Sequence, residues 1–75
     1  MSKFEKLLER IKNNPKTVRF EEIEKVLLGA GYVCLNAKGS HYTFRKQDKQ
    51  PITIPRHLPY VGEIYVKKVI LELGL

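Results

Sequence analysis

The sequence predicts a single α+β domain in which three helices cover one face of a small three-stranded antiparallel sheet. Three observations predict this fold: two helical stripes of apolar residues near the start, alternating residues in the middle, and a third helical stripe near the end. A chain of 75 residues has material for one hydrophobic core. We therefore expect the order α-α-β-β-β-α, with the other face of the sheet open to solvent.

The first 30 residues contain two of these helical stripes. The first stripe consists of Phe4, Leu7, Leu8 and Ile11. Ser2 is suited to cap its start, and residues 13–14 should end it because Pro15 disfavours helical geometry in the residue before it. The second stripe runs from residue 20 to residue 30, with acidic residues near its start, where the helix dipole favours them. Glycines at 29 and 31 should end this second helix.

Residues 32–55 are predicted to form the sheet. A turn at residues 38–40 separates an apolar segment, 32–37, from a second strand, 41–45. In the second strand, alternation directs Tyr42 and Phe44 toward the core and His41, Thr43 and Arg45 toward solvent. Residues 51–55 are bounded by prolines, which is typical of an edge strand. For the first strand, the pattern does not indicate which side faces inward.

A loop and a third helix complete the predicted chain. Residues 56–62 contain a proline and a glycine and should form the loop. The third helical stripe follows, and Gly74 is suited to end it. This last stripe consists of Val66, Val69, Ile70 and Leu73.

Positive charge is the clearest feature of the composition. Fourteen Lys and Arg residues against eight acidic residues give a net charge of +6, and residues 1–19 and 35–57 each contribute +4. This balance favours a polyanionic partner, with nucleic acid first and an acidic protein second. No segment is typical of a signal peptide or long and apolar enough to cross a bilayer, so we expect a cytoplasmic protein without a membrane partner.

Cysteine and histidine usage restricts the chemistry. Cys34 is the single cysteine, which excludes an internal disulfide and a multi-cysteine zinc motif, and we expect it to be a small buried apolar side chain. Cys34, His41 and His57 together fit no compact metal motif by their spacing. We therefore expect neither a metal nor another cofactor.

His41 is the main candidate for catalysis. An imidazole on the solvent face could move the proton of an RNA 2′-hydroxyl, while nearby cations hold the phosphate. RNA supplies its own nucleophile in such a reaction, so a metal is not required. His57 is the candidate for a second proton-transfer group, although an imidazole at a strand end also serves simply to hydrogen-bond the loop. The candidates for holding RNA phosphate are Lys38, Ser40, Arg45 and Arg56.

Two other classes of function fit the same residues. A lone surface histidine in a small basic domain is more often structural than catalytic. The chain could therefore be a non-catalytic RNA-binding module that reads RNA shape. It could also be an interaction protein whose basic face binds an acidic partner. Only the enzyme would turn RNA over, and only the third class would lack affinity for RNA.

Several short motifs resemble one known family. These are Gly31-Tyr32, residues 38–44 (Lys-Gly-Ser-His-Tyr-Thr-Phe), residues 53–57 (Thr-Ile-Pro-Arg-His) and residues 66–70. In this order and spacing they resemble the HicA toxin family, with residues 20–75 as its core. The single domain, residues 1–75, would then carry residues 1–14 as an extra N-terminal helix.

The resemblance implies a fold like that of the double-stranded RNA-binding domain and an endoribonuclease that cleaves mRNA. The family's catalytic histidine corresponds to His41. Asn36 stands where members often carry a basic residue, so the role of holding phosphate would pass to Lys38 or Arg45. The resemblance also implies a protein partner, a HicB-type antitoxin that covers the site and blocks it.

Overall fold

The protein has the predicted α+β fold. The computed structural model describes residues 2–56 and 58–75, apart from the side chains at positions 36 and 37. The elements are α1 (Lys3–Asn13), the short 3₁₀ helix η1 (Pro15–Thr17), α2 (Phe20–Gly29), β1 (Val33–Lys38), β2 (His41–Arg45), β3 (Ile52–Pro55) and α3 (Glu63–Glu72). The strands form one antiparallel sheet in the order β1-β2-β3, so β2 is the central strand. The predicted element order α-α-β-β-β-α is confirmed.

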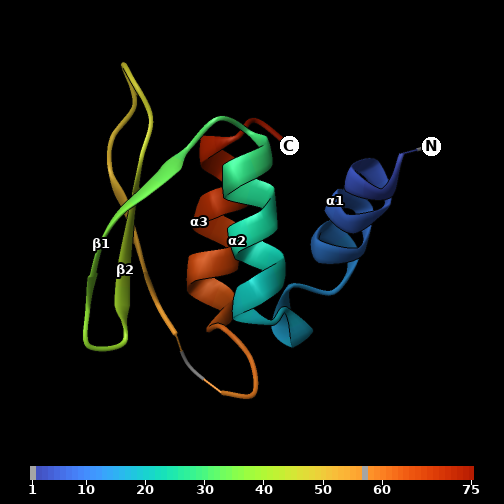
Figure 1. Cartoon of the computed structure of the whole chain (residues 1–75). Helices are drawn as coiled ribbons and strands as arrows, with labels where there is room; N and C mark the ends of the chain where they lie inside the picture. Colours follow the sequence, from blue (N-terminus) through green and yellow to red (C-terminus); the bar gives the residue numbers. More distant parts are fainter. Residues whose placement is uncertain (1, 57) are drawn as a thin grey trace.

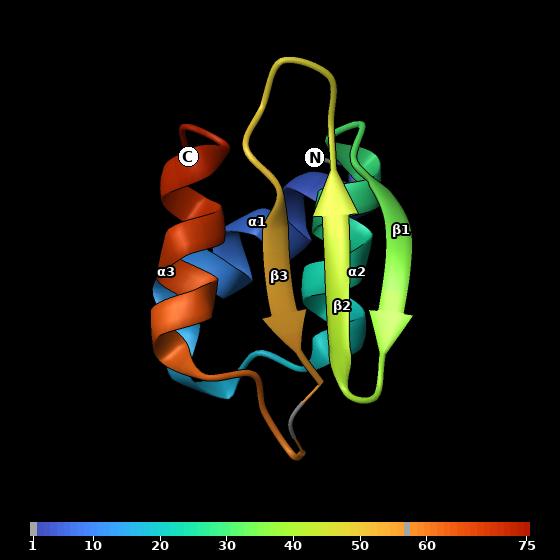
Figure 2. The same cartoon turned by 90° about the vertical axis from the view of Figure 1, so that its left-hand side faces the viewer.

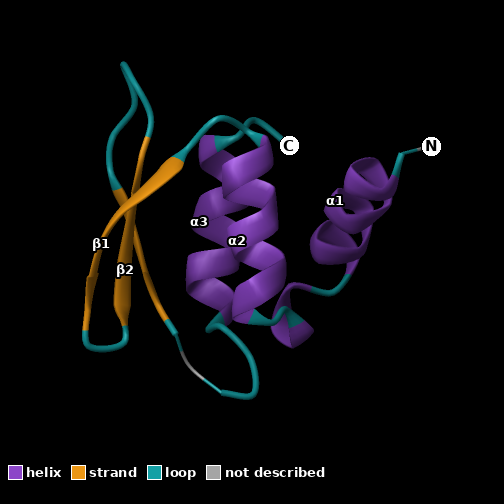
Figure 3. Cartoon of the chain, in the orientation of Figure 1, coloured by secondary structure: helices purple, strands orange, loops and turns teal. Residues whose placement is uncertain are grey.

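The elements form three layers. Helices α2 and α3 lie side by side against one face of the sheet, and α1 lies on the far side of that helix pair (Figure 1). Turned by 90°, the molecule presents the sheet in front and all helices behind it (Figure 2). Coloured by secondary structure, the same view as Figure 1 shows that strands and helices do not mix within a layer (Figure 3). One face of the sheet is therefore covered and the other is open.

Helix α1 is fixed to α2 by close packing and by charge. Its start is capped as predicted, since the Ser2 hydroxyl accepts the N–H of Glu5 at 3.1 Å. The Phe4 ring lies so close to Gly29 that a Cβ at position 29 would clash with it. Ile11 is buried in the common core, and the Arg10 guanidinium forms an ion pair with Glu22. The absence of a side chain at Gly29 is what permits this close approach.

A two-residue turn joins β1 to β2. Gly39 has φ +61°, a conformation that residues with a Cβ rarely adopt, and it brings Lys38 directly opposite His41. A positive φ at the first central residue alone is the pattern of a type II′ hairpin turn, which matches the twist of the two strands. The N–H of Arg56 donates to the carbonyl of Ser40 at 2.6 Å. The end of β3 is thereby tied to the turn that precedes His41.

The covered face of the sheet contributes to the core that it shares with the helices. Phe44, Ile52 and Ile54 are fully buried there, and the Phe20 ring of α2 lies 4.8 Å from the Tyr42 ring and 6.5 Å from the Phe44 ring, centre to centre. The predicted inward direction of Tyr42 and Phe44 is confirmed. The remaining buried residues are Ile11, Val18, Ile23, Val26, Leu27, Tyr32, Val61, Val66 and Val69.

The expectation that Cys34 is buried is wrong. Its Cα pairs with Phe44, a core residue, yet its side chain is exposed. The pairing of β1 with β2 shifts between Cys34 and Asn36, which leaves Leu35 as an extra, 61 % exposed residue. Cys34 and Leu35, beside the bulge on this edge strand, are therefore both exposed. The apolar pattern of the segment therefore did not indicate burial.

Candidate active site

Strand pairing defines a polar surface on the uncovered side of the sheet, which we call the open face. His41 lies opposite Lys38 on β1 and opposite Pro55 on β3. Two residues further along β2, Thr43 lies opposite Thr53. Because residues directly opposite each other share a face, the alternation of β2 fixes the whole set. Among the side chains that the structure describes, those on the open face are Val33, Lys38, His41, Thr43, Arg45, Thr53 and Pro55.

His41 occupies the start of the central strand on this face. Its side chain is exposed, as the alternation predicted. Within residues 2–56 and 58–75, its imidazole has no hydrogen bond or ion pair to another side chain. An imidazole presented in this way is accessible to a ligand that lies across the sheet and can give or accept a proton there.

Lys38 is the predicted phosphate-binding cation that lies directly opposite His41. Residues directly opposite in an antiparallel pair have Cβ atoms about 5 Å apart, so the Lys38 ammonium can reach a phosphate that the imidazole also contacts. Arg45 is also exposed on the open face but lies four residues further along β2, roughly 13 Å away at the usual rise per residue. Lys38 and Arg45 therefore lie at different positions along the open face.

Arg56 lies apart from this surface. Its guanidinium contacts Glu21 at 3.3 Å and lies over the Phe20 ring, 5.6 Å from the ring centre, so it packs at the start of α2. Its contact with the Tyr42 hydroxyl, together with the Glu21 carboxylate, raises the pKa of Arg56. Ser40 is exposed in the turn next to His41, and its carbonyl accepts the Arg56 N–H. Arg56 therefore fastens the turn to α2, and its charge is directed away from His41.

The positive segment 35–57 thus divides between the open face and the helices. Lys46, which the sequence groups with Arg45, donates from Nζ to the carbonyl of Ala30 at 2.7 Å and lies 5.8 Å from the centre of the Tyr32 ring. A cation at the C-terminal end of α2 satisfies a carbonyl that the helix leaves unpaired. The sequence does not show that Arg45 and Lys46 belong to different surfaces. The structure does, because β2 ends at Arg45 and Lys46 is no longer part of the sheet.

Sequence reasoning placed Thr43 on the solvent side but gave it no role, and it did not connect Thr43 with Thr53. The two hydroxyl oxygens lie 3.2 Å apart across β2 and β3. The alternation of Thr53 between Ile52 and Ile54 was the available signal. His57, the candidate for a second proton-transfer group, lies outside the described residues.

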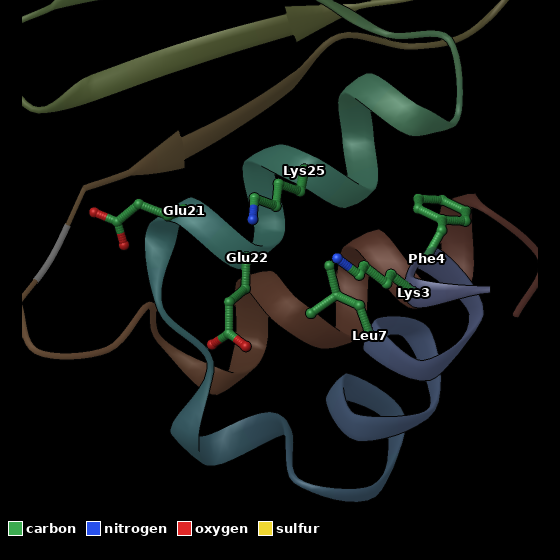
Figure 4. A pocket seen from close by; sticks show the side chains of 6 residues that line it. All are labelled: Lys3, Phe4, Leu7, Glu21, Glu22 and Lys25. Carbon is green, nitrogen blue, oxygen red and sulfur yellow. The ribbon is translucent and has the colours of Figure 1, made fainter. Parts of the chain in front are cut away.

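A cavity of about 410 Å³ lies elsewhere, between α1 and α2 (Figure 4). Lys3, Phe4 and Leu7 of α1 line it, and the sheet lies on the opposite side of α2. The helix layer therefore separates this cavity from His41. The α2 side chains that line it are Glu21, Glu22 and Lys25.

The fold agrees with the comparison against known families. The sequence model described as the HicA toxin of bacterial toxin–antitoxin systems matches residues 20–75. The chain belongs to the HicA toxin family. The match begins at the first residue of α2, so α1 and η1 lie outside it. Comparison with curated proteins and with solved structures gives no match.

Family membership gives the protein a role as the toxin of a toxin–antitoxin pair. The match contains both the hairpin that carries His41 and the strand that carries Thr53. None of the helices in the described part of the chain is both long and apolar enough to cross a membrane. The open face, with His41, Lys38 and Arg45, lies within residues 20–75, the part of the chain that matches the family.

Proposed function

We propose that this HicA-family protein is a metal-independent endoribonuclease that cleaves mRNA, with His41 as its general acid or base. The observation that carries the proposal is the exposed imidazole of His41 on the central strand, directly opposite Lys38. Family membership supports the role of a toxin, for which cleavage of mRNA is an effective means of stopping growth. The net charge of +6 supports a polyanionic substrate.

The proposed reaction is a transfer within the RNA itself. The 2′-oxygen attacks the adjacent phosphorus, the bond from phosphorus to the 5′-oxygen of the next nucleotide breaks, and a 2′,3′-cyclic phosphate and a 5′-hydroxyl result. One proton must leave the 2′-hydroxyl and one must reach the departing oxygen. The His41 imidazole exchanges one of these protons, which contributes about 10² to 10⁴ to the rate in comparable enzymes.

Lys38 has the best position to stabilise the phosphate during this reaction. Negative charge develops on the phosphate oxygens as the 2′-oxygen attacks, and a nearby cation lowers its energy. The Lys38 ammonium reaches the same phosphate as His41, whereas Arg45 reaches a phosphate further along the strand. Ser40, beside His41 in the turn, is proposed as a hydrogen-bond donor to phosphate. Arg56 is proposed to contribute mainly by holding that turn, because Glu21 and Phe20 engage its guanidinium.

His57 is proposed as the partner that exchanges the second proton. It follows Arg56, whose backbone N–H is bonded to the turn before His41. Replacement of His57 should lower the cleavage rate less than replacement of His41, because a water molecule can exchange the second proton in place of His57. A double replacement that is no slower than the His41 variant alone would show that the two histidines act as one unit.

We also propose that a HicB-type antitoxin neutralises the protein by covering the open face. A basic surface favours an acidic partner, and the association should weaken as salt concentration rises. Blocking access to His41 would then stop cleavage without any change in the toxin's fold. Addition of the antitoxin should abolish cleavage at a ratio set by the stoichiometry of the complex.

The central experiment compares the parent with His41→Ala on end-labelled single-stranded RNA. We expect the variant to lose a factor of about 10² to 10⁴ in rate and to keep the parent's unfolding transition, because position 41 is exposed. The parent's products should end in a cyclic phosphate, and a chelator should leave its rate unchanged. Expression in bacteria should arrest growth with the parent and not with the variant.

Three outcomes decide against parts of the proposal. A His41→Ala protein that cuts RNA as fast as the parent removes His41 from the mechanism. A parent that binds RNA with strong salt dependence but never cuts it supports the non-catalytic module instead. Loss of activity on chelation, restored by a divalent cation, would contradict the metal-independent reaction.

A further inference from the structure

Beside His41, the open face carries a pair of hydroxyl groups that the proposed mechanism does not use. Thr43 on the central strand and Thr53 on β3 lie opposite each other, with their Oγ1 atoms 3.2 Å apart. In such a pair one hydroxyl donates to the other, which leaves one proton and several lone pairs free to bond outward. Thr53 is exposed, and Thr43 is half-buried. The pair therefore offers both a donor and an acceptor to a ligand on the open face.

The Thr43–Thr53 pair lies where an RNA strand that runs along β2 and passes over His41 would contact it. Thr43 lies two positions along β2 from His41, a rise of about 6.8 Å, and Arg45 lies two positions further on. On β3, Thr53 stands in the same relation to Pro55, which lies opposite His41. A hydroxyl pair thus lies midway between the candidate proton-transfer group and a cation.

The described side chains of the open face include no aromatic ring of the kind that stacks on RNA bases. Single-strand binding sheets stack bases on exposed Phe, Tyr or Trp side chains. In the described part of the open face, the pairing of the strands brings none of these residues to the surface, since Tyr42 and Phe44 face the helices. The hydroxyl groups and cations that are described there suit contacts with the sugar–phosphate backbone.

We propose that the Thr43–Thr53 pair binds the ribose and phosphate of the nucleotide next to the cleaved bond, and that Arg45 binds the following phosphate. The inference rests on the proposed ribonuclease function and adds a substrate class, single-stranded RNA lying along β2 and held through its backbone. In this arrangement, the threonine hydroxyl whose proton is not used within the pair donates a hydrogen bond to a phosphate oxygen. A threonine hydroxyl oxygen accepts a hydrogen bond from the 2′-hydroxyl of the ribose. Binding is therefore weakly dependent on base sequence and prefers ribose to deoxyribose.

The test removes both hydroxyl groups while keeping their shape. In Thr43→Val with Thr53→Val, we expect an approximately tenfold rise in KM with kcat little changed, since hydrogen bonds to the backbone are lost but the proton-transfer group is untouched. Thr43→Ser with Thr53→Ser keeps the hydroxyls and should restore most of the affinity. Thr17→Val, on the 3₁₀ helix before α2, is the off-site control and should match the parent.

Binding measured in the His41→Ala background separates affinity from cleavage. RNA and DNA of the same sequence serve as probes. The parent pair should bind RNA more tightly than DNA, and the valine pair should lose most of this difference. Arg45→Gln should reduce the slope of log affinity against log salt by about 0.7, whereas the neutral valine changes should leave that slope unaltered.

Each result has a separate meaning. A valine pair that cleaves and binds like the parent overturns the inference and leaves the ribonuclease proposal intact. A parent that cuts no RNA but shows the predicted ribose preference overturns the ribonuclease proposal and retains the binding surface. If the double valine variant does not fold, the single variant at the exposed position, Thr53→Val, decides between these outcomes by the same RNA-to-DNA ratio.

Discussion

The two faces of the sheet differ in what their residues do, although the residues alternate along the same strands. On the covered face, Phe44, Ile52 and Ile54 are fully buried and hold the sheet to α2 and α3. On the open face, His41 and Arg45 are exposed and contribute nothing to that core. Residues that stabilise the fold and residues that are free to contact a ligand thus alternate along β2. Neighbouring positions in β2 should therefore respond to mutation in opposite ways.

The sharpest test of this contrast is a pair of adjacent residues. Phe44→Ala empties a fully buried aromatic site and should lower the free energy of unfolding by about 3–5 kcal/mol. Arg45→Ala, one position on and exposed, should change it by less than about 0.5 kcal/mol while weakening RNA binding. Chemical denaturation measures both. Equal destabilisation by the two changes would show that the open face is not independent of the core.

A change in the turn before His41 tests whether one structural element affects both the stability of the fold and the geometry of the open face. Gly39→Ala should cost about 1–2 kcal/mol of stability, because φ is +61° at this position. It should also slow RNA cleavage, since the turn sets the position of His41 and Lys38. Gly39→Asn is the matched control, because asparagine tolerates positive φ better than alanine does. An alanine variant as stable and active as the parent would contradict the role of this turn.

The smallest expected effect concerns α1, the layer furthest from the open face. Burial of Glu22 would by itself raise its pKa, but hydrogen bonds from Arg10 and from the Arg19 N–H outweigh burial and lower the pKa below 4.5. A lowered folded-state pKa gives stability that is fully present above pH 4.5 and is lost as the pH falls through the folded value. Arg10→Gln should therefore cost about 1 kcal/mol or less at neutral pH.

Thermal unfolding across pH checks this assignment. The difference between the parent and Arg10→Gln should shrink as the solution becomes acid, because protonated Glu22 no longer pairs. Lys67→Gln removes an exposed ion pair with Glu63 and serves as the control, with an effect of about 0.3–0.5 kcal/mol. Cleavage of RNA should be unaffected by Arg10→Gln, since α1 lies beyond the helix pair (Figure 1). A slower cleavage rate would mean that α1 communicates with the open face.

Much of the fold was predictable because its signals are local. Pro15 ends α1, and strict alternation from His41 to Arg45 fixed which side of β2 faces water. In β1, alternation did not indicate the inward side, and Cys34, expected to be buried because of its residue type, is exposed beside the bulge between Cys34 and Asn36. A bulge depends on the partner strand, so the sequence of one strand does not reveal it.

The candidate site was predictable only in part for a related reason. His41 and Lys38 flank a two-residue turn, so their proximity follows from the turn itself. The neighbours of Arg56 come from α2, more than 30 residues earlier, and no local pattern connects them. The Thr43–Thr53 pair likewise depends on the register between β2 and β3. The loop of residues 46–51 joins these strands, and its sequence does not predict that register. Contacts between residues that are far apart in the sequence could therefore not be predicted from local patterns.

The remote position of α1 has a practical consequence for handling this protein. The start of the chain emerges on the side of the molecule opposite the sheet (Figure 1). An affinity tag or a fluorescent dye attached ahead of Ser2 would project away from the surface that carries His41. Immobilisation through that end would leave the sheet facing the solution, so that nucleic acid or an inhibitor could be applied to it directly.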